Sequence, residues 1–410
     1  MKKYTDESWD FRRSDTKTYT HCFHSYPAMM IPQVAGRLLE KYGRQARRVL
    51  DPFCGTGTSL VEANLRGISA FGTDLNPLAC LIATAKTTVI NLQKLDLYLK
   101  NFNDFLFAAR FNGVKSEVEL PAFPNIDFWF GKPIQRDLAI VKKYIAEIVE
   151  TDVQNFFKVA FSETVREVSR TRNSEFKLYR MTEKQLERFQ PDVFGMIEAK
   201  LARNRKGLET FVVDRKPSHT TVVRSSSSEM LFDSDFDLIL TSPPYGDSRT
   251  TVAYGQFSRL SNQWLDFENV TSLDNHLLGG KTSKEPFKFE SKVLRETLAK
   301  VADADEKRAL EVASFYVDYR NSIKNIARVV RKRGFACFVV GNRKVKGVSL
   351  PTDEITIDFF AENNFRHVET IVRNIPNKRM PCKNSPTNVT GAKDTTMTQE
   401  FIVILQESSC

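Results

Sequence analysis

Cysteine and histidine are scarce in this sequence of 410 residues, and their spacing argues against metal sites and redox-active cysteine pairs. The six cysteines lie far apart, without a C-x-x-C pair, and no histidine accompanies them at metal-ligand spacing. Structural zinc sites and redox-active dithiols depend on such spacing. We therefore expect no metal site, and reduced thiols of the kind found in cytoplasmic proteins.

Long apolar runs are also absent. A helix that spans a bilayer needs about 20 consecutive, mostly apolar residues, and no segment approaches that length. The segment Met1–Glu7 lacks the apolar core of a secretory signal. These absences predict a cytoplasmic protein without a membrane partner.

Basic residues, in contrast, are plentiful. The 60 lysines and arginines outnumber the 50 acidic residues, which gives a net charge of +10 and a pI near 9.2. Such a surplus favours a polyanionic partner, although charge alone does not identify one. A chain of this length is longer than the usual size of a domain built around one hydrophobic core. We therefore expect one main domain of about 250 residues that carries insertions.

A glycine-rich segment, DPFCGTGT at residues 51–58, joins a predicted strand to a predicted helix at 59–66. A second strand follows and ends at Asp74. Glycines let the backbone approach a ligand, and an acidic residue about 20 positions later can accept hydrogen bonds from ribose hydroxyls. Because the acidic Asp51 stands at the mouth, the pattern disfavours phosphate and suits a cationic nucleoside such as S-adenosylmethionine.

A second motif, TSPPYG at residues 241–246, follows the apolar strand 236–240. Ligands in open α/β sheets bind at the carboxyl ends of strands. The Ser242 hydroxyl can accept a hydrogen bond, and the Pro243 carbonyl stays available because no helix can use it as an acceptor. The Tyr245 ring offers an aromatic face for stacking. These residue types suit a flat molecule that carries an exocyclic amine, although an isolated double proline can also merely end a strand.

In this order, the two motifs resemble those of the DNA amino-methyltransferases, which methylate exocyclic amines with S-adenosylmethionine. Residues 51–57 resemble the cofactor loop, residues 74–77 the ribose-binding segment and residues 242–245 the catalytic tetrapeptide. Serine at the first place of the tetrapeptide is commonest in the branch that modifies cytosine, and aspartate in the adenine branch. The resemblance covers roughly residues 18–90 and 217–406.

The resemblance implies a set of site residues. The catalytic residues would be Ser242, Pro243, Pro244 and Tyr245. The cofactor-binding residues would be His24, Tyr26, Asp51, Pro52, Phe53, Cys54, Gly55, Gly57, Thr58, Asp74, Leu75 and Asn76. For His24, cofactor contact and plain packing carry equal weight. A serine run, 225–228, stands where the family usually has an acidic contact to the adenine, so which residue makes that contact is left open.

The implied fold is α/β, a seven-stranded, Rossmann-like sheet of the class I methyltransferases with a large helical insertion. Residues 1–90 and 217–410 would form the methyltransferase domain, residues 91–216 the insertion and residues 1–17 a loose arm. Later strands are predicted at 219–224, 335–340, 365–372 and 401–405. Helical periodicity is found at 29–42, 92–111, 134–150, 156–168, 183–208, 314–333 and 351–363.

Two regions are candidates for contact with double-stranded DNA. The insertion has an aromatic corner at 128–130 and is either a target-recognition region or a solvated helical cap; it carries Arg166, Arg170, Arg172, Lys177, Arg180, Lys200, Arg203, Arg205 and Lys206. The loops beyond the strand ends offer Arg249, Arg343, Lys344, Lys378, Arg379 and Lys383 for phosphate contact. Residues 247–309 lack clear periodicity, which is typical of a substrate loop or of disorder, and could line the pocket with Thr250, Thr251, Tyr254 and Arg259.

The expected reaction is methyl transfer to the amine of a flipped-out cytosine. Adenine-N6 methylation is the runner-up, and methylation of a guanine amine in RNA is a further alternative. A carbon-5 mechanism through Cys382 is rejected, because its Pro-Cys nucleophile belongs where Ser242 and Pro243 stand. A fused nuclease built on Asp192 and Glu198 is disfavoured because that stretch is helical, and a silent DNA-binding subunit is disfavoured by the intact motifs. A cognate restriction endonuclease could accompany such an enzyme.

Overall fold

The computed structural model describes residues 2–112, 118–172, 176–229, 232, 235–247, 251–282, 288–375, 383–384, 394–395 and 397–408. Its centre is a mixed sheet in the order β1-β9-β12-β6-β5-β2-β3-β4. The strands are β1 Lys3–Thr5, β2 Arg48–Asp51, β3 Ser69–Asp74, β4 Thr220–Arg224, β5 Phe236–Thr241, β6 Val330–Val340, β9 Phe365–Asn374 and β12 Gln399–Glu407. The predicted α/β class is confirmed.

The sheet has eight strands, where seven were predicted. The additional strand is β1, which pairs in parallel with β9 through Thr5 and Val372. The arm that contains it is well packed, because Trp9 is 3% exposed and Asp10 is 1% exposed. The prediction of a loose arm is therefore wrong; three residues of strand are too short to produce a recognisable periodicity.

The order of the strands places the two motifs side by side. From β2 the chain proceeds outward through β3 to β4, then returns to β5 on the other side of β2. Strands β2 and β5 are parallel neighbours, with Leu50 opposite Ile239, so their carboxyl ends lie at one edge. Ligands of open α/β sheets bind at such a reversal of strand order.

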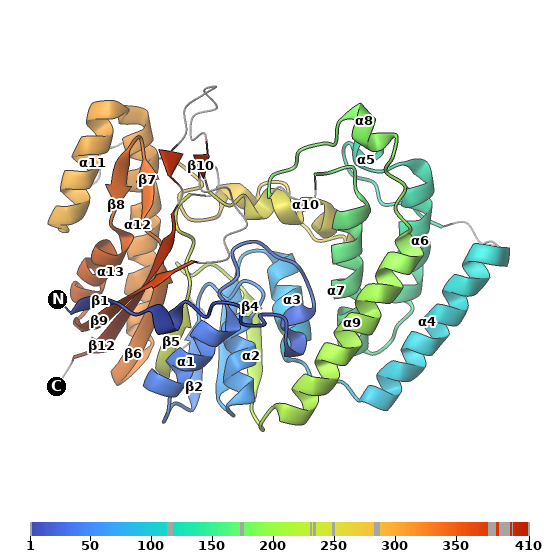
Figure 1. Cartoon of the computed structure of the whole chain (residues 1–410), viewed down its shortest axis with the longest axis horizontal. Helices are drawn as coiled ribbons and strands as arrows, with labels where there is room; N and C mark the ends of the chain where they lie inside the picture. Colours follow the sequence, from blue (N-terminus) through green and yellow to red (C-terminus); the bar gives the residue numbers. More distant parts are fainter. Residues whose placement is uncertain are drawn as a thin grey trace.

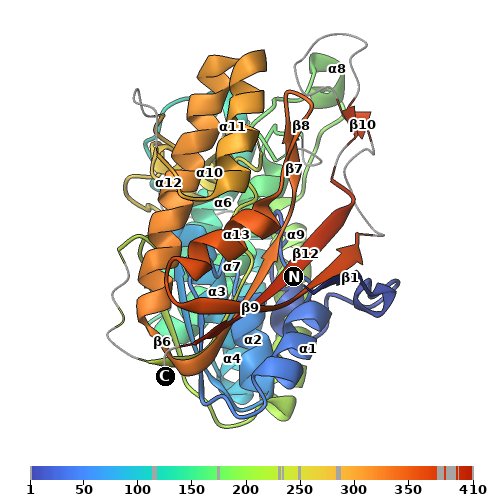
Figure 2. The ribbon, with the colours of Figure 1, turned by 90° about the vertical axis from the view of Figure 1, so that its left-hand side faces the viewer.

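Helices cover both faces of the sheet (Figures 1 and 2). Successive residues of β6 alternate between the two cores: Phe338 packs with α12 and α13, whereas Val339 packs with α1 and α2. Alternation of this kind follows from the two-residue period of a strand. The helices named here are α1 Pro32–Tyr42, α2 Thr58–Leu65, α3 Pro77–Thr87, α12 Glu306–Arg328 and α13 Thr352–Ala361.

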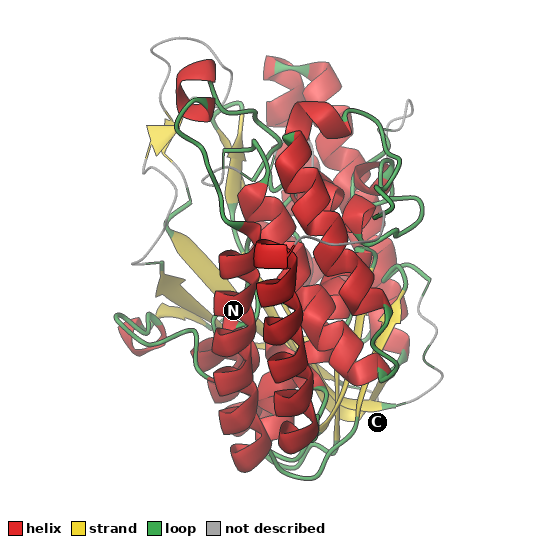
Figure 3. Cartoon of the chain, turned by 90° about the vertical axis from the view of Figure 1, so that its right-hand side faces the viewer, coloured by secondary structure: helices red, strands yellow, loops and turns green. Residues whose placement is uncertain are grey.

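A helical block follows α3 and stands beside the sheet (Figure 1), and Figure 3 shows the molecule from the side of this block. Its helices are α4 Leu92–Asn112, α5 Ile126–Trp129, α6 Lys132–Ala146, α7 Thr151–Val168, α8 Glu183–Leu186 and α9 Val193–Asp214. Leu78 and Ile82 of α3 share one hydrophobic core with Phe156 and Leu208 of the block. The block is therefore packed firmly on α3. The predicted helix 183–208 is broken before α9, where Asp192 caps the new helix by accepting from the Gly195 N–H.

Residues 247–309 contain more regular structure than their sequence indicated. Helices α10 Tyr254–Trp264 and α11 Lys292–Ala304 lie within them, together with the short 3-10 helix η3 Leu273–Asn275. Helix α12 begins at Glu306 because Asp305 caps it, and it ends at Arg328, not at the predicted Arg333. Strand β6 starts directly afterwards at Val330. Long polar helices with a narrow apolar stripe explain why the pattern was missed.

The remaining elements are short. They are the 3-10 helices η1 Glu7–Trp9 and η2 Tyr19–Cys22, the hairpin β7 Arg343–Val345 with β8 Val348–Leu350, and the pair β10 Lys383–Asn384 with β11 Asp394–Thr395. No helix in the described ranges is both long enough and apolar enough to cross a membrane.

Candidate active site

The glycine-rich loop connects the end of β2 to the start of α2. Gly57 has φ +77°, and a Cβ there would stand only 3.0 Å from Ala83 Cβ, so the turn needs glycine. Gly55 has φ +49°, and an added Cβ there would meet no atom within 4 Å. The loop is thus tight against α3 at Gly57 and open toward the cavity at Gly55.

Two carboxylates flank this loop. Asp51 accepts hydrogen bonds from the Ser59 hydroxyl, from Thr241 Oγ1 at 2.6 Å and from the Phe53 N–H at 3.1 Å. Asp74 accepts from the N–H groups of Asn76 at 2.8 Å and Gly55 at 3.1 Å. Burial raises the pKa of both carboxyl groups to about 6, against the hydrogen bonds that lower it. Near pH 7 the site therefore holds two buried negative charges, which a cationic ligand would stabilise.

An aromatic wall stands across from the carboxylates. Tyr26 stacks on Tyr254 with ring centroids 6.1 Å apart and meets Phe257 edge-on at 5.5 Å. The Asn76 side-chain amide donates to the Tyr26 hydroxyl at 2.8 Å and to Ser258 Oγ at 2.8 Å. Asn76 thus ties the ribose-segment candidate to the wall formed by the N-terminal segment and α10.

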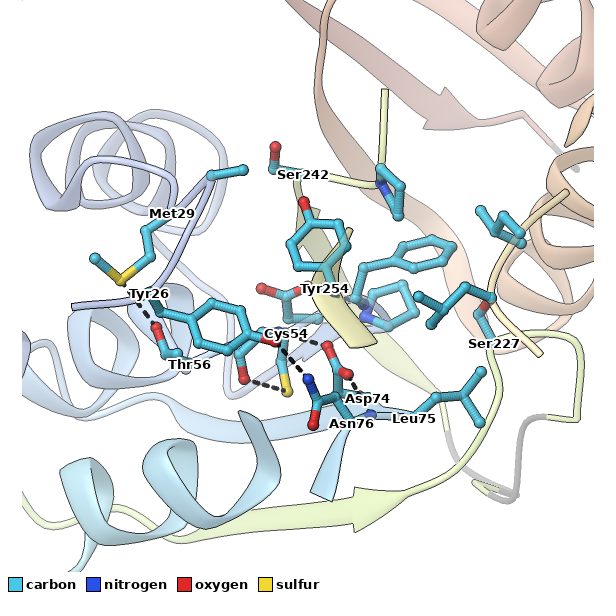
Figure 4. A pocket seen from close by; sticks show the side chains of 18 of the residues that line it. Tyr26, Met29, Cys54, Thr56, Asp74, Leu75, Asn76, Ser227, Ser242 and Tyr254 are labelled. Atoms are coloured by element: carbon cyan, nitrogen blue, oxygen red, sulfur yellow. Dashed lines mark hydrogen bonds between the residues drawn. The ribbon is translucent and has the colours of Figure 1, made fainter. Parts of the chain in front are cut away.

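These residues enclose a cavity of about 930 Å³, part of it open to solvent. Figure 4 shows Asp74 and Asn76 on its floor, Ser242 at the top and Tyr254 projecting between them. The predicted residues that line it are Tyr26, Asp51, Pro52, Phe53, Cys54, Gly55, Thr58, Asp74, Leu75, Asn76, Ser242 and Pro244.

Several lining residues had only weak signals in the sequence. Ser225–Ser227 form one wall, at the position where the adenine contact was left open, and Tyr254 also lines the cavity. The lining residues that the sequence did not single out as site residues are 27–30, Thr56 and the segment 276–278. Thr56 Oγ1 donates to Met29 Sδ at 3.1 Å, so these two missed residues are joined. A tyrosine-proline pair just before a helix was the only available signal for residues 27–30.

Four of the predicted catalytic and cofactor-binding residues do not line the cavity, and neither do Thr251 and Arg259. His24 is 2% exposed, and its Nδ1 lies 2.8 Å from the carbonyl oxygen of Ser25. Gly57 supports the turn from behind, and Pro243 is buried. Tyr245 points toward β12, where its hydroxyl donates to Glu400 Oε1 at 3.0 Å. For His24, the arrangement favours the packing interpretation.

The catalytic-loop candidates are joined to the sheet by hydrogen bonds. Ser242 Oγ donates to the Val339 carbonyl of β6 at 3.1 Å and lies 3.3 Å from the Tyr245 hydroxyl. The Tyr245 ring lies over Gly341, where a Cβ would come within 2.6 Å of Tyr245 Cδ2. Burial raises the pKa of the Cys54 thiol well above its usual value, which disfavours a thiolate in the cavity.

The basic residues predicted to contact DNA phosphates differ in exposure. Arg343 was expected to meet phosphate, but its side chain is 11% exposed and its guanidinium pairs with the buried Asp247 at 3.1 Å. Burial of this pair next to Gly246 indicates a structural role, which corrects the prediction. Lys344 is exposed on β7. Arg249, Lys378 and Arg379 lie outside the described residues, and for Lys383 only the β10 backbone is described.

Many cations of the helical block are already neutralised within the protein. Ion pairs at 2.6 Å join Lys200 to Glu167, Arg203 to Glu163 and Arg205 to Asp96. Arg166 is 5% exposed and stacks on Phe257. The number of basic residues in this block therefore overstates how much positive charge it presents to a partner.

No protein-family model matches the chain. The type II methyltransferase M.MvaI of Kocuria varians is 42% identical over 424 aligned positions, which cover 97% of this chain and 93% of that protein. The tRNA (guanine(10)-N2)-dimethyltransferase of Pyrococcus abyssi is 32% identical over 75 residues, or 18% of this chain and 21% of that protein. Among solved structures, the rRNA methyltransferase aviRa from Streptomyces viridochromogenes is 11% identical, covers 97% of this chain and 95% of that chain, and has a TM-score of 0.34.

Proposed function

The chain belongs to the type II DNA methyltransferases of restriction–modification systems, whose cofactor is S-adenosylmethionine, and from this premise we propose that it methylates the exocyclic amine of cytosine in duplex DNA. The observation that carries the proposal is the position of Ser242, which lines the same cavity as Asp51 and Asp74. One crevice thus joins a site for a cationic nucleoside to a site for an amine.

The residues present fit S-adenosylmethionine. Asp74 would accept the ribose hydroxyls, Asp51 would offset positive charge, and the open space beside Gly55 would admit the cofactor close to the backbone. Ser225–Ser227 and Leu75 would lie around the adenine. When bound, S-adenosylmethionine supplies a methyl group activated by its sulfonium.

Ser242 and the carbonyl of Pro243 would accept the two protons of the target amine. Holding both protons draws the nitrogen lone pair out of conjugation with the ring and aims it at the cofactor side of the crevice. The cytosine amine is paired inside a duplex, so the base must leave the stack to reach this loop. Tyr245, which lies beside Ser242 but outside the cofactor cavity, would replace part of the lost stacking with its ring face.

Adenine is the runner-up base, because the amine-binding loop would hold an N6 amine in the same way. Serine at position 242 favours cytosine by the tendency of the family. A guanine amine in RNA is a further alternative, favoured by the local similarity to a tRNA dimethyltransferase. That similarity spans 18% of the chain, whereas the similarity to the type II methyltransferase spans 97%.

Recognition of a particular DNA sequence is assigned, as part of the proposal, to the helical block 91–216 and to the loops that carry Lys344, Lys378, Arg379 and Lys383. The Leu178 N–H donates to Gln256 Oε1 of α10 at 3.3 Å, so the block reaches the helix that carries Tyr254 into the cavity. A cognate endonuclease that cuts the same unmodified sequence would complete the system.

Transfer of labelled methyl from S-adenosylmethionine to duplex DNA and to tRNA, measured side by side, tests the substrate. We expect incorporation into DNA alone, and its loss with Ser242→Ala while cofactor binding persists. The matched control is Ser218→Ala, a serine at the amino-terminal side of β4, which should leave transfer intact. Preferential labelling of tRNA would contradict the proposal.

A further inference from the structure

Glu400 of β12 stands behind the catalytic loop. Its Oε1 accepts the Tyr245 hydroxyl at 3.0 Å, while its Oε2 pairs with the Arg373 guanidinium. The Arg373 side chain is 5% exposed and is held by the main chain, because it donates to the carbonyls of Trp9 at 2.9 Å and Asp10 at 3.3 Å. The position of Glu400 is thus fixed from the N-terminal arm.

The protons of this network can be counted. A carbonyl oxygen and an ionised carboxylate accept hydrogen bonds but cannot donate them. The single hydroxyl proton of Ser242 is taken by the Val339 carbonyl, and that of Tyr245 is taken by Glu400. The two hydroxyl oxygens lie 3.3 Å apart. Either hydroxyl could therefore donate to the other if it no longer donated to its present acceptor.

We propose that Glu400 is a positioning residue that draws the Tyr245 proton away from Ser242 and so keeps the Ser242 oxygen free to accept from the target amine. Without this carboxylate, the Tyr245 hydroxyl would turn its proton to Ser242 Oγ and occupy one of the two lone pairs with which that oxygen accepts hydrogen bonds, which makes it a weaker acceptor for the substrate amine. The inference rests on the proposed function, in which Ser242 accepts an amine proton.

The variant Glu400→Gln removes the negative charge of this side chain and keeps its size. Arginine only donates, so Arg373 selects the amide oxygen of Gln and leaves the amide NH2 facing Tyr245. The Tyr245 hydroxyl then becomes an acceptor toward the amide, and its own proton turns to Ser242. We expect kcat to fall at least tenfold, with the affinity for S-adenosylmethionine unchanged.

A second variant, Tyr245→Phe, removes the tyrosine hydroxyl and distinguishes a positioning role of Glu400 from a structural one. In Tyr245→Phe no hydroxyl can occupy Ser242, so adding Glu400→Gln to it should lower kcat by less than about twofold. A purely structural role of Glu400 predicts instead that the two fold-changes multiply. Recovery of kcat in the double variant relative to Glu400→Gln alone is a signature that loss of stability cannot produce.

A control is Glu369→Gln. Glu369 is a buried carboxylate of β9 that lies away from the cavity and accepts from Tyr4 at 3.0 Å, from Tyr42 and from Lys41 at 2.6 Å. This variant should lower thermal stability but leave kcat per folded molecule unchanged. If the unaltered protein methylates an amine but the Glu400 and Tyr245 effects multiply, this inference is overturned while the proposed function stands. If the unaltered protein methylates no amine, the proposed function fails first.

Discussion

At the scale of single residues, the site depends on two carboxylates whose pKa is raised by burial. Asp51 and Asp74 come from neighbouring strand ends, and the hydrogen bonds they accept come from hydroxyl and backbone N–H donors of the described residues. Burial disfavours the ionised form, so it raises the pKa of both carboxyl groups and makes the site receptive to positive charge.

Asp74→Ala should weaken cofactor binding by about 1.5 to 3 kcal/mol, the range for hydrogen bonds to a charged group. Calorimetric titration with S-adenosylmethionine measures the change. The control is Asp237→Ala, because Asp237 also accepts from two backbone N–H groups, those of Arg47 and Arg48, but at the opposite edge of the sheet. An affinity unaffected by Asp74→Ala would remove this residue from the site.

Cofactor affinity should depend on pH with a definite sign. Because burial raises the pKa of Asp51 and Asp74 to about 6, both become protonated as pH falls through 6, and the negative charge that favours a cation is lost. Affinity should therefore decrease from pH 7 to pH 5, by up to about tenfold per pH unit for each group that must release a proton. Asp74→Asn should flatten the dependence; an increase of affinity at pH 5 would contradict the assignment of charges.

At the scale of elements, regular periodicity and motif order were readable from the sequence, and tertiary pairing was not. Strand β4 follows the long helical block at the predicted position, because its β-branched run of threonines and valines is bounded by Pro217 and the serine run. Strand β1 was missed because its pairing with β9 joins residues more than 360 positions apart. The orientation of Tyr245 could not be read from its motif, since Glu400 lies on a strand 155 residues away.

The hairpin β7–β8 illustrates how one basic cluster divides into two roles. Arg343→Ala should lower stability, because it leaves the buried Asp247 without one of its arginine partners; thermal unfolding measures the effect. Lys344→Ala, at an exposed neighbouring position, should spare stability.

Phosphate contact predicts a different readout for the loop lysines. In the double variant Lys344→Ala, Lys378→Ala, the slope of log K for DNA against log salt should decrease by roughly one for each phosphate that is no longer neutralised, with cofactor binding unchanged. Binding measured at several salt concentrations gives the slope. If the slope stays the same, these lysines belong to the ordinary surface.

At the scale of the whole molecule, the N-terminal arm and the helical block are both integral to the fold. The arm reaches across β9, where Asp10 accepts from the Asn374 N–H at 2.7 Å, and the block shares its core with α3. The sequence predicted helices within the block, but their packing on α3 involves long-range contacts that periodicity does not encode.

Trp9→Ala tests the role of the arm. Trp9 is 3% exposed and packs in the core with α1 while Arg37 lies over its ring, so its truncation should cost about 3 to 5 kcal/mol. Denaturant unfolding gives the value. A cost below about 1 kcal/mol, the usual range for surface positions, would mean that the arm is dispensable for the fold.

The reaction proposed for the whole molecule is direct methyl transfer to the amine of cytosine. Digestion of DNA modified by the purified protein, followed by mass spectrometry of the nucleosides, identifies the methylated atom. We predict N4-methylcytosine, and we expect the Cys54→Ala and Cys382→Ala variants to remain active. N6-methyladenine would transfer the assignment to the runner-up base, and 5-methylcytosine, or loss of activity on removal of Cys382, would contradict the mechanism.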